Sequence, residues 1–375
     1  MTTAPFHPSV EQLISQPHEQ GIRAVAVLGT GAELPLDIVD YEISFDERRT
    51  PYVQGTIDVP VPSDQATLDA LDPRTLIRVK VFVWYRLPSG VVDEHQLLYL
   101  QARRRRLTRS DDNRAVLTLD LTSSEAAFID ALTPSPLSSE DATWTASTLK
   151  NAVGSLLSDA FTGTPMAGVI ANGPTIGGSV ELPLVPHPWD AVSDAADALD
   201  FDVYDPGMFV EWLVEPRVLV TGQPSLTLSV GANGTIMTSE TGVSRDDWAN
   251  WVAVTYEWTT SAGARGTAGG FANVTGGPYT PASAGYKILT DHRLMYGTNA
   301  QATRASRTIL QRMLARSRSY SLSAVPAWWL RPRQTVALTL PLGSQERHLV
   351  SSVSFSPGTM RLTTRLPDTA SVIGE

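Results

Sequence analysis

The chain has 375 residues, no cysteine and a formal net charge of −10. That length exceeds one ordinary hydrophobic core, so we expect two or three domains. Without cysteine, disulfide scaffolds, cysteine-ligated metal sites and cysteine nucleophiles are excluded. The acidic charge argues against a general nucleic-acid binder, because phosphate contacts need clustered cations. We expect no secretory signal and no membrane span, since no run approaches ~18 consecutive apolar residues.

The first third of the chain has the alternation of apolar and polar residues that is typical of β-strands. Residues 1–20 are polar and predict an N-terminal arm. The strongest strand is Arg78–Arg86, and further strands are expected over 96–107 and 115–121. Turn residues recur between these strands at the spacing of a barrel or sandwich. We therefore expect a first β-barrel domain over residues 21–134.

The middle of the chain changes from strand to helix periodicity. A short helix is expected from Ser123, and a Pro/Ser-rich linker follows it. Helical faces at 149–160 and 189–199 lead into Phe201–Tyr204 and the turn Asp205–Gly207. Helices followed by a hairpin predict a small α+β insert domain over residues 135–220.

The last part of the chain returns to β texture. A strand is expected at Trp251–Trp258, a long exposed Gly/Ala/Thr-rich loop at Gly263–Gly277, and the longest helix at 298–317. The closing strands are expected at 335–340, 347–355 and 360–366. These elements predict a second β-barrel domain over residues 221–375. The fold class is therefore mainly β, with two β-barrel domains flanking a small α+β domain.

Residues that could carry catalysis or bind a metal are scattered. The six histidines are isolated from one another. Ser147 and Lys150 match the Ser-x-x-Lys pattern of a catalytic serine, but the companion motifs of that pattern are missing. Ser147 is therefore expected to be a helix N-cap. Carboxylates occur in two groups, which are Asp200, Asp202 and Asp205, and Asp246, Asp247 and Glu257. The first group lacks the spacing of a calcium-binding loop. Nothing in the sequence places the second group across a cleft, as the two acids of a glycosidase would need. We expect no enzyme activity, no metal and no cofactor.

Two short segments favour contacts between subunits. Four consecutive arginines in a strand place two side chains on each face, and a core cannot hold two unpaired guanidinium groups. A solvated edge strand, an intersubunit surface and nucleic acid remain alternatives for that run. Two adjacent tryptophans in an extended segment point in different directions, which favours one at an interface. The candidate intersubunit residues are Arg103, Arg104, Arg105, Arg106, Trp328 and Trp329.

The last hundred residues carry a family pattern. An Ala/Arg-rich helix, Ala302–Arg316, precedes Tyr320–Pro332, and strands with Leu349–Phe355 and Met360–Arg365 end the pattern. This arrangement resembles the C-terminal barrel of the tail hub, or baseplate hub, proteins of contractile and long-tailed bacteriophages. The sequence departs from that family at Arg333-Gln334, where Gly-Asp is usual, which puts the tight turn before the next strand in doubt.

The resemblance implies a structural minor tail protein of the virion tail tip, assembled in the host cytoplasm, with no catalytic residues. It implies a homotrimer in which two barrels per subunit form a pseudo-sixfold ring. Its expected partners are the distal tail protein, the tape measure protein and tip or fibre proteins, with DNA touched only in passage through the lumen. An acidic wall suits that passage. The arginine-biased, high-GC composition suits a long-tailed phage of actinobacteria.

Two other functions remain open from the sequence. A host-surface carbohydrate-binding β module would use an exposed tryptophan such as Trp84 or Trp212 to stack on sugars. A cell-wall hydrolase is the third candidate, although no catalytic motif supports it.

Overall fold

The structure is a computed structural model that describes most of the chain. None of the described helices combines the length and the apolar composition that crossing a membrane requires. The described residues are 18–109, 115–130, 144–148, 175–182, 201–208, 212–218, 220–231, 234–243, 248–259, 264–293, 297–316, 318–339, 345–366 and 372–374, with Phe6, Val10, Ile14, Trp189, Ser193, Ala196 and Arg245.

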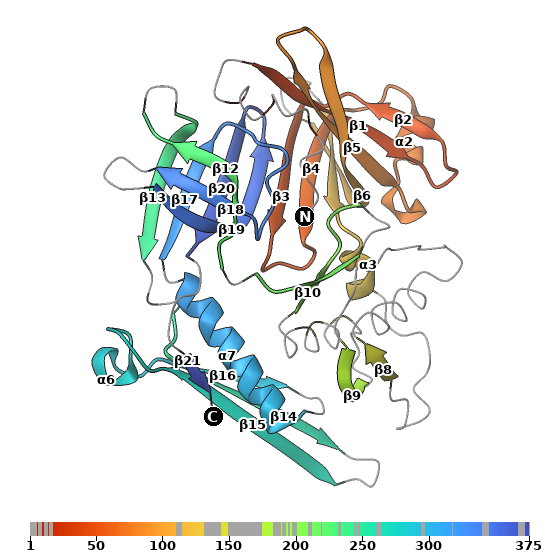
Figure 1. The fold of residues 1–375 in the computed structure, drawn as a ribbon. Coiled ribbons are helices and arrows are strands. Elements are labelled where there is room, and N and C mark those ends of the chain that lie inside the picture. The colour runs from red at the N-terminus through yellow and green to blue at the C-terminus, as the bar shows by residue number, and fades with distance from the viewer. Residues whose placement is uncertain are drawn as a thin grey trace.

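A 13-stranded sheet, called the large sheet below, forms the body of the molecule (Figure 1). Its main path runs in the order β13-β17-β20-β19-β3-β4-β7-β6-β5-β1-β2, and β18 with β12 branches from β19. Its strands are β1 (Glu19–Val27), β2 (Glu33–Leu36), β3 (Asp40–Asp46), β4 (Val53–Pro60), β5 (Arg78–Arg86), β6 (Val92–Arg109), β7 (Ala115–Thr122), β12 (Pro224–Ser229), β13 (Ile236–Val243), β17 (Arg318–Ala324), β18 (Thr335–Thr339), β19 (Gln345–Ser356) and β20 (Thr359–Arg365).

The expected strands of the first and last parts of the chain are confirmed. β5 has the predicted bounds and buries every second residue, as a strand with one covered face should. β19 is long enough to pair with β18 through its first half and with β3 through its second half. This shared strand joins residues of the expected first and second β domains in one sheet. The mainly β prediction is confirmed, whereas the described strands form no closed barrel.

A second, four-stranded sheet, called the small sheet, lies apart from the large one (Figure 1). It has the order β16-β14-β15-β21, with the longest helix, α7 (Asn299–Arg316), packed on it. The apolar side chains between α7 and the sheet form a cluster separate from the core of the large sheet. The strands are β14 (Trp251–Thr259), β15 (Arg265–Val274), β16 (Ile288–Arg293) and β21 (Val372–Gly374).

The expected loop over Gly263–Gly277 is wrong for most of its length, because β15 occupies Arg265–Val274. One of its glycines, Gly270, lies directly under α7. A Cβ on Gly270 would lie inside van der Waals contact with the backbone of Thr303 on α7. Small residues here let helix and sheet approach closely, so the composition that suggested a loop reflects packing.

The remaining elements are short. The helices are α2 (Gln65–Ala70), the 3-10 helix η1 (Pro73–Thr75), α3 (Glu125–Asp130) and α6 (Pro281–Ala284). Two two-stranded ladders complete the fold, and they are β8 (Trp144–Thr148) with β9 (Thr175–Leu182), and β10 (Phe201–Tyr204) with β11 (Leu213–Pro216). Ser147, expected as a helix N-cap, lies in β8, and the helix expected over 149–160 lies outside the described residues.

The described residues of the expected N-terminal arm pack on the large sheet. Phe6, Val10 and Ile14 are buried in its core, and the Ile14 amide donates to the Val10 carbonyl at 3.1 Å. The Phe6 ring meets the edge of Tyr85 at 5.2 Å between centroids. These residues therefore contribute to the core of the fold.

Candidate functional site

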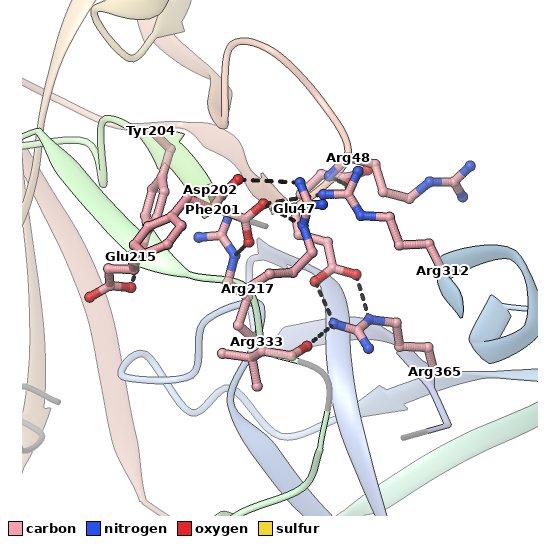
Figure 2. Close-up of polar contacts among 12 residues, drawn as sticks. Glu47, Arg48, Phe201, Asp202, Tyr204, Glu215, Arg217, Arg312, Arg333 and Arg365 are labelled. Carbon is pink, nitrogen blue, oxygen red and sulfur yellow. Dashed lines mark hydrogen bonds and ion pairs between the residues drawn. The ribbon is translucent and has the colours of Figure 1, made fainter. Parts of the chain in front are cut away.

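A cluster of buried charges lies where the β10–β11 hairpin, α7 and the large sheet meet (Figure 2). We call this cluster the charged junction. Asp202 on β10 lies at its centre, surrounded by Arg217, Arg312 and Arg333. The Asp202 carboxylate lies 3.3 Å from Arg217, 3.3 Å from Arg312 on α7 and 3.0 Å from Arg333. Burial by itself would raise the pKa of Asp202, but the three arginines outweigh it and hold the pKa below its ordinary value. The carboxylate is therefore charged and links three separate segments.

A second ion pair extends the charged junction to the end of β20. Glu47 follows β3, and its carboxylate accepts two hydrogen bonds from Arg365, at 2.7 and 3.2 Å. Arg365 also donates to the Val218 carbonyl at 2.8 Å, just after β11. Bidentate pairs of this kind fix geometry as well as charge. The hairpin is thus tied to both halves of the large sheet (Figure 2).

Arg333 has an unusual backbone conformation for a residue with a side chain. Its φ of 72° lies in the left-handed region that favours glycine. The tight turn expected from the family pattern nevertheless forms, since the Arg333 amide donates to the Val350 carbonyl at 2.8 Å and the Gln334 amide donates to the Arg331 carbonyl at 3.3 Å. The guanidinium of Arg333 lies 3.9 Å from the ring centroid of Tyr204, and Tyr204 donates to Glu215 at 2.9 Å.

Next to the charged junction, two acidic side chains are buried side by side. Asp205 accepts hydrogen bonds from the Ser124 and Gly207 amides, both at 2.8 Å, from the Met208 amide at 3.1 Å, and from the Ser124 hydroxyl. Glu125 accepts from the Asp205 amide at 2.9 Å. Burial, and then the Asp205 charge, raises the pKa of Glu125 to about 8. Glu125 therefore carries a proton at neutral pH, while Asp205, whose carboxylate accepts hydrogen bonds from three backbone amides and the Ser124 hydroxyl, carries the charge.

A cavity of about 330 Å³ opens between these groups. Its described lining includes five arginines and three acidic residues, so positive charge dominates. Within the described ranges, no group of three or more His, Asp or Glu side chains is placed to hold a metal ion. The chemistry that this site offers is the fixed presentation of guanidinium groups.

The predicted arginine run lies on β6, away from this site. Arg104 and Arg106 are exposed, Arg103 and Arg105 are half-buried, and a β-bulge falls between Ala102 and Arg104. Arg106 pairs with Asp120 at 2.9 Å, Arg105 donates to the Leu68 carbonyl, and burial lowers the pKa of Arg103. The expected alternation between faces is therefore present. The intersubunit role of the run stays a prediction.

The two adjacent tryptophans lie in the core of the large sheet. Trp328 is fully buried and stacks on Phe355 with 4.6 Å between ring centroids. The Trp328 amide donates a hydrogen bond to the Tyr85 hydroxyl at 3.1 Å. Trp329 is also buried, and its indole donates to the Ser225 carbonyl at 3.2 Å. Within one chain both are packing residues, and their contact with another subunit stays a prediction.

The other sequence candidates have different surroundings. Asp202 and Asp205, considered for calcium, are instead engaged by arginines and by amides. Glu257 lies 3.3 Å from His292 in an exposed pair on the small sheet. Asp200, Asp246 and Asp247 lie outside the described residues.

The small sheet has one face that no described element covers. On this face Trp251 stacks on Phe271, with ring centroids 5.1 Å apart and planes at 9°, and Tyr286 lies 5.8 Å from Trp251. Phe271 is 37% exposed, Tyr286 67% and Ile288 57%. The register places Trp251 beside Ile288 and opposite Asn273 on the same face. We call this surface the aromatic face.

Comparison with known proteins finds solved structures with a similar fold but no matching sequence. No protein-family model matches the sequence, and no curated protein sequence matches it either. The tail protein from Neisseria meningitidis MC58 has a TM-score of 0.63 at 14% identity, over 92% of this chain and 96% of its own. The 43 kDa tail protein of prophage MuSo2 from Shewanella oneidensis has a TM-score of 0.63 at 13% identity, over 94% and 100%.

A third structure is similar to a lesser degree. The prophage tail protein gp18 from Listeria monocytogenes EGD-e has a TM-score of 0.50 at 11% identity, over 92% of this chain and 95% of its own. All three likenesses extend over nearly the whole of both chains. The phage-tail part of the resemblance is therefore confirmed at the level of fold, and this chain has the fold of phage tail proteins.

Proposed function

We propose that this protein is a non-enzymatic structural component of a phage tail, a hub at the tail tip. Three copies form a ring that joins the tail tube and the distal tail protein to tip or fibre proteins and surrounds the DNA exit channel. The observation that carries the proposal is the likeness to two phage tail proteins over 92% and 94% of the chain. A likeness along the full length supports a common arrangement of parts.

The internal arrangement supports a pseudo-sixfold ring. The large sheet of each subunit consists of two groups of strands, and they meet where β3 pairs with β19. The first group is β1–β7, and the second is β12, β13 and β17–β20. Three subunits with two β regions each supply six such regions around the channel. The charged junction fixes the β10–β11 hairpin and α7 against this sheet, and a ring subunit needs such fixed angles to close.

Two surface properties also support an assembled protein. The aromatic face is a contiguous apolar patch of the kind that is covered in complexes. The net charge of −10 suits a channel through which DNA slides without binding. The tape measure protein is a further expected partner of the ring.

Mass measurement and imaging of the purified chain test this proposal. We expect light scattering after size-exclusion chromatography to give the mass of a trimer, and negative-stain images to show rings with threefold symmetry. A monodisperse monomer at every micromolar concentration, with no ring in the images, contradicts the hub.

Carbohydrate binding is a second candidate that one observation favours. Trp212, one of its two expected residues, is fully buried against Trp189, at 5.7 Å between centroids, and is not available to stack on a sugar. The stacked pair of Trp251 and Phe271 on the aromatic face offers an exposed platform instead. A glycan array that is positive for the wild type and negative for Trp251→Ala supports this candidate, and an array with no bound glycan contradicts it.

A further inference from the structure

The backbone at Arg333 points to a role for its side chain. A residue with a Cβ is strained in the left-handed region, because the Cβ lies too close to the following carbonyl oxygen, and glycine has no such strain. Arg333 takes this conformation while its side chain is only 8% exposed. Strain of this kind is concentrated at binding sites, where the surrounding structure maintains it. The guanidinium is thus held in place beside the cavity at the expense of backbone strain.

The charges around the cavity are not balanced by the groups present. Five arginines line it, and Asp202 is shared among Arg217, Arg312 and Arg333. Glu47, a second acidic lining residue, is engaged by Arg365, which is not among the lining residues. The third, Glu125, is protonated at neutral pH. Net positive charge therefore remains in the cavity, although the chain as a whole is acidic.

Several buried donors at the cavity have nothing to bind within the described residues. The Nη1 of Arg333 and the Nε of Arg49 are buried and make no hydrogen bond there. Arg49 uses its Nη2 to donate to the Ser44 hydroxyl at 2.6 Å. The Oε2 of Glu125 is also buried without a partner, and a protonated carboxyl has one hydrogen to donate. Unsatisfied buried donors are rare in folded proteins, and a ligand that accepts hydrogen bonds from them would account for several at one place.

We propose that this cavity binds an oxyanion, either a phosphate or a carboxylate, between Arg333, Arg49 and Arg312. Guanidinium groups present parallel N–H donors that match both anions. A cavity of about 330 Å³ holds either one with its first waters. The bound anion completes the charge balance at the place where the β10–β11 hairpin, α7 and the large sheet meet, and so stabilises their relative arrangement.

Thermal unfolding of the full chain in defined salts tests the site. The probes are inorganic phosphate and glutarate, each compared with sodium chloride at equal ionic strength. We expect an oxyanion at 100-fold excess over its Kd to raise the Tm by about 5 °C more than chloride does. A shift with phosphate alone identifies a phosphate site, a shift with glutarate alone identifies a carboxylate site, and no shift with either overturns the proposal.

Matched variants locate the effect. Arg49→Gln removes a guanidinium that has no carboxylate partner among the described residues, so the fold should be retained, and we expect at least a tenfold weaker Kd by calorimetry. Arg333→Gly removes the side chain and relieves the backbone strain, and it should abolish binding. The exposed Arg361 on β20 is the control, and Arg361→Gln should bind as the wild type does. Wild-type affinity in Arg49→Gln, or an equal loss in Arg361→Gln, overturns the assignment.

Discussion

The large and small sheets bury their apolar side chains in different ways. The large sheet forms one continuous apolar cluster from strands at both ends of the chain, and Phe6, Val10 and Ile14 are buried in it as well. The small sheet is covered by α7 on one side only, and its other side carries Trp251, Phe271 and Ile288. The large sheet thus makes its core from its own chain, whereas the small sheet leaves an apolar face open to solvent.

This difference separates residues that hold the fold together from residues that are free to contact other molecules. Substitutions in the core of the large sheet or at the charged junction should reduce the free energy of unfolding. Substitutions on the aromatic face should leave it nearly unchanged. The following four predictions test this division, from the largest expected effect to the smallest.

The first prediction contrasts two aromatic residues. Trp328→Ala empties a fully buried position stacked on Phe355 and should lower the free energy of unfolding by about 3–5 kcal/mol. Phe271→Ala on the aromatic face should lower it by less than about 1 kcal/mol. Urea unfolding followed by circular dichroism measures both. Equal losses would remove the distinction between the two sheets.

The second prediction concerns the charged junction. Asp202→Asn leaves three guanidinium groups without their shared carboxylate and should lower the free energy of unfolding by about 3 kcal/mol. The control is Asp120→Asn, which breaks the more exposed pair with Arg106 and should cost about 0–1 kcal/mol. Urea unfolding at low and high salt compares them. If Asp202→Asn is as mild as the control, the junction does not stabilise the fold.

The third prediction compares the two faces of a single strand, β15. A Cβ on Gly270 meets the Thr303 backbone of α7, so Gly270→Ala should lower the free energy of unfolding by about 1–3 kcal/mol. A Cβ on the neighbouring Gly269 comes no closer than 3.8 Å, to the Val254 carbonyl, and Gly269→Ala should change stability by less than about 0.5 kcal/mol. Thermal melts measure the stability of both variants. If Gly270→Ala is as stable as the wild type, α7 does not pack on β15 as described.

The fourth prediction is a pH dependence. Burial and Asp205 raise the pKa of Glu125 from 4.5 to about 8, so the folded chain holds a proton that the unfolded chain releases. The free energy of unfolding should therefore fall as the pH rises from about 4.5 to about 8. Glu125→Gln should show a smaller fall over this range in urea titrations. The exposed Glu240→Gln is the control and should keep the wild-type dependence, and identical profiles for all three proteins would contradict a protonated Glu125.

Local pattern was sufficient to predict most of the strands but not the charged junction. The alternation of apolar and polar residues predicts both ends of β5 correctly, because a strand with one covered face buries every second side chain. Phe6, Val10 and Ile14 have a spacing of four that signals a buried face, but the polar residues around them obscured it. The Gly/Ala composition of β15 reflects contact with α7, which no local rule reveals.

The charged junction depends on pairs that are distant in the sequence. The sequence shows Asp202 only as one of a group of carboxylates, because its partner Arg312 lies on a helix 110 residues away. In the sequence, Arg333 is marked only by its departure from the family pattern, which has glycine there. That departure is the sequence signal that points to the site, because neighbouring groups must hold a side chain whose backbone is left-handed. Periodicity reports which face is covered, and it carries no information on which distant charge lies opposite.

The ladder between β3 and β19 has a consequence for how the chain is made. Ile43 lies beside Phe355, so the ribosome must add the intervening residues before this pair can form. At roughly 5–20 residues per second, that takes about 15–60 s. During this interval the β3 edge has no β19 to pair with, and an open strand edge attracts other chains. Expression at low temperature with abundant chaperones should therefore raise the soluble yield, whereas fragments that end before β19 should aggregate.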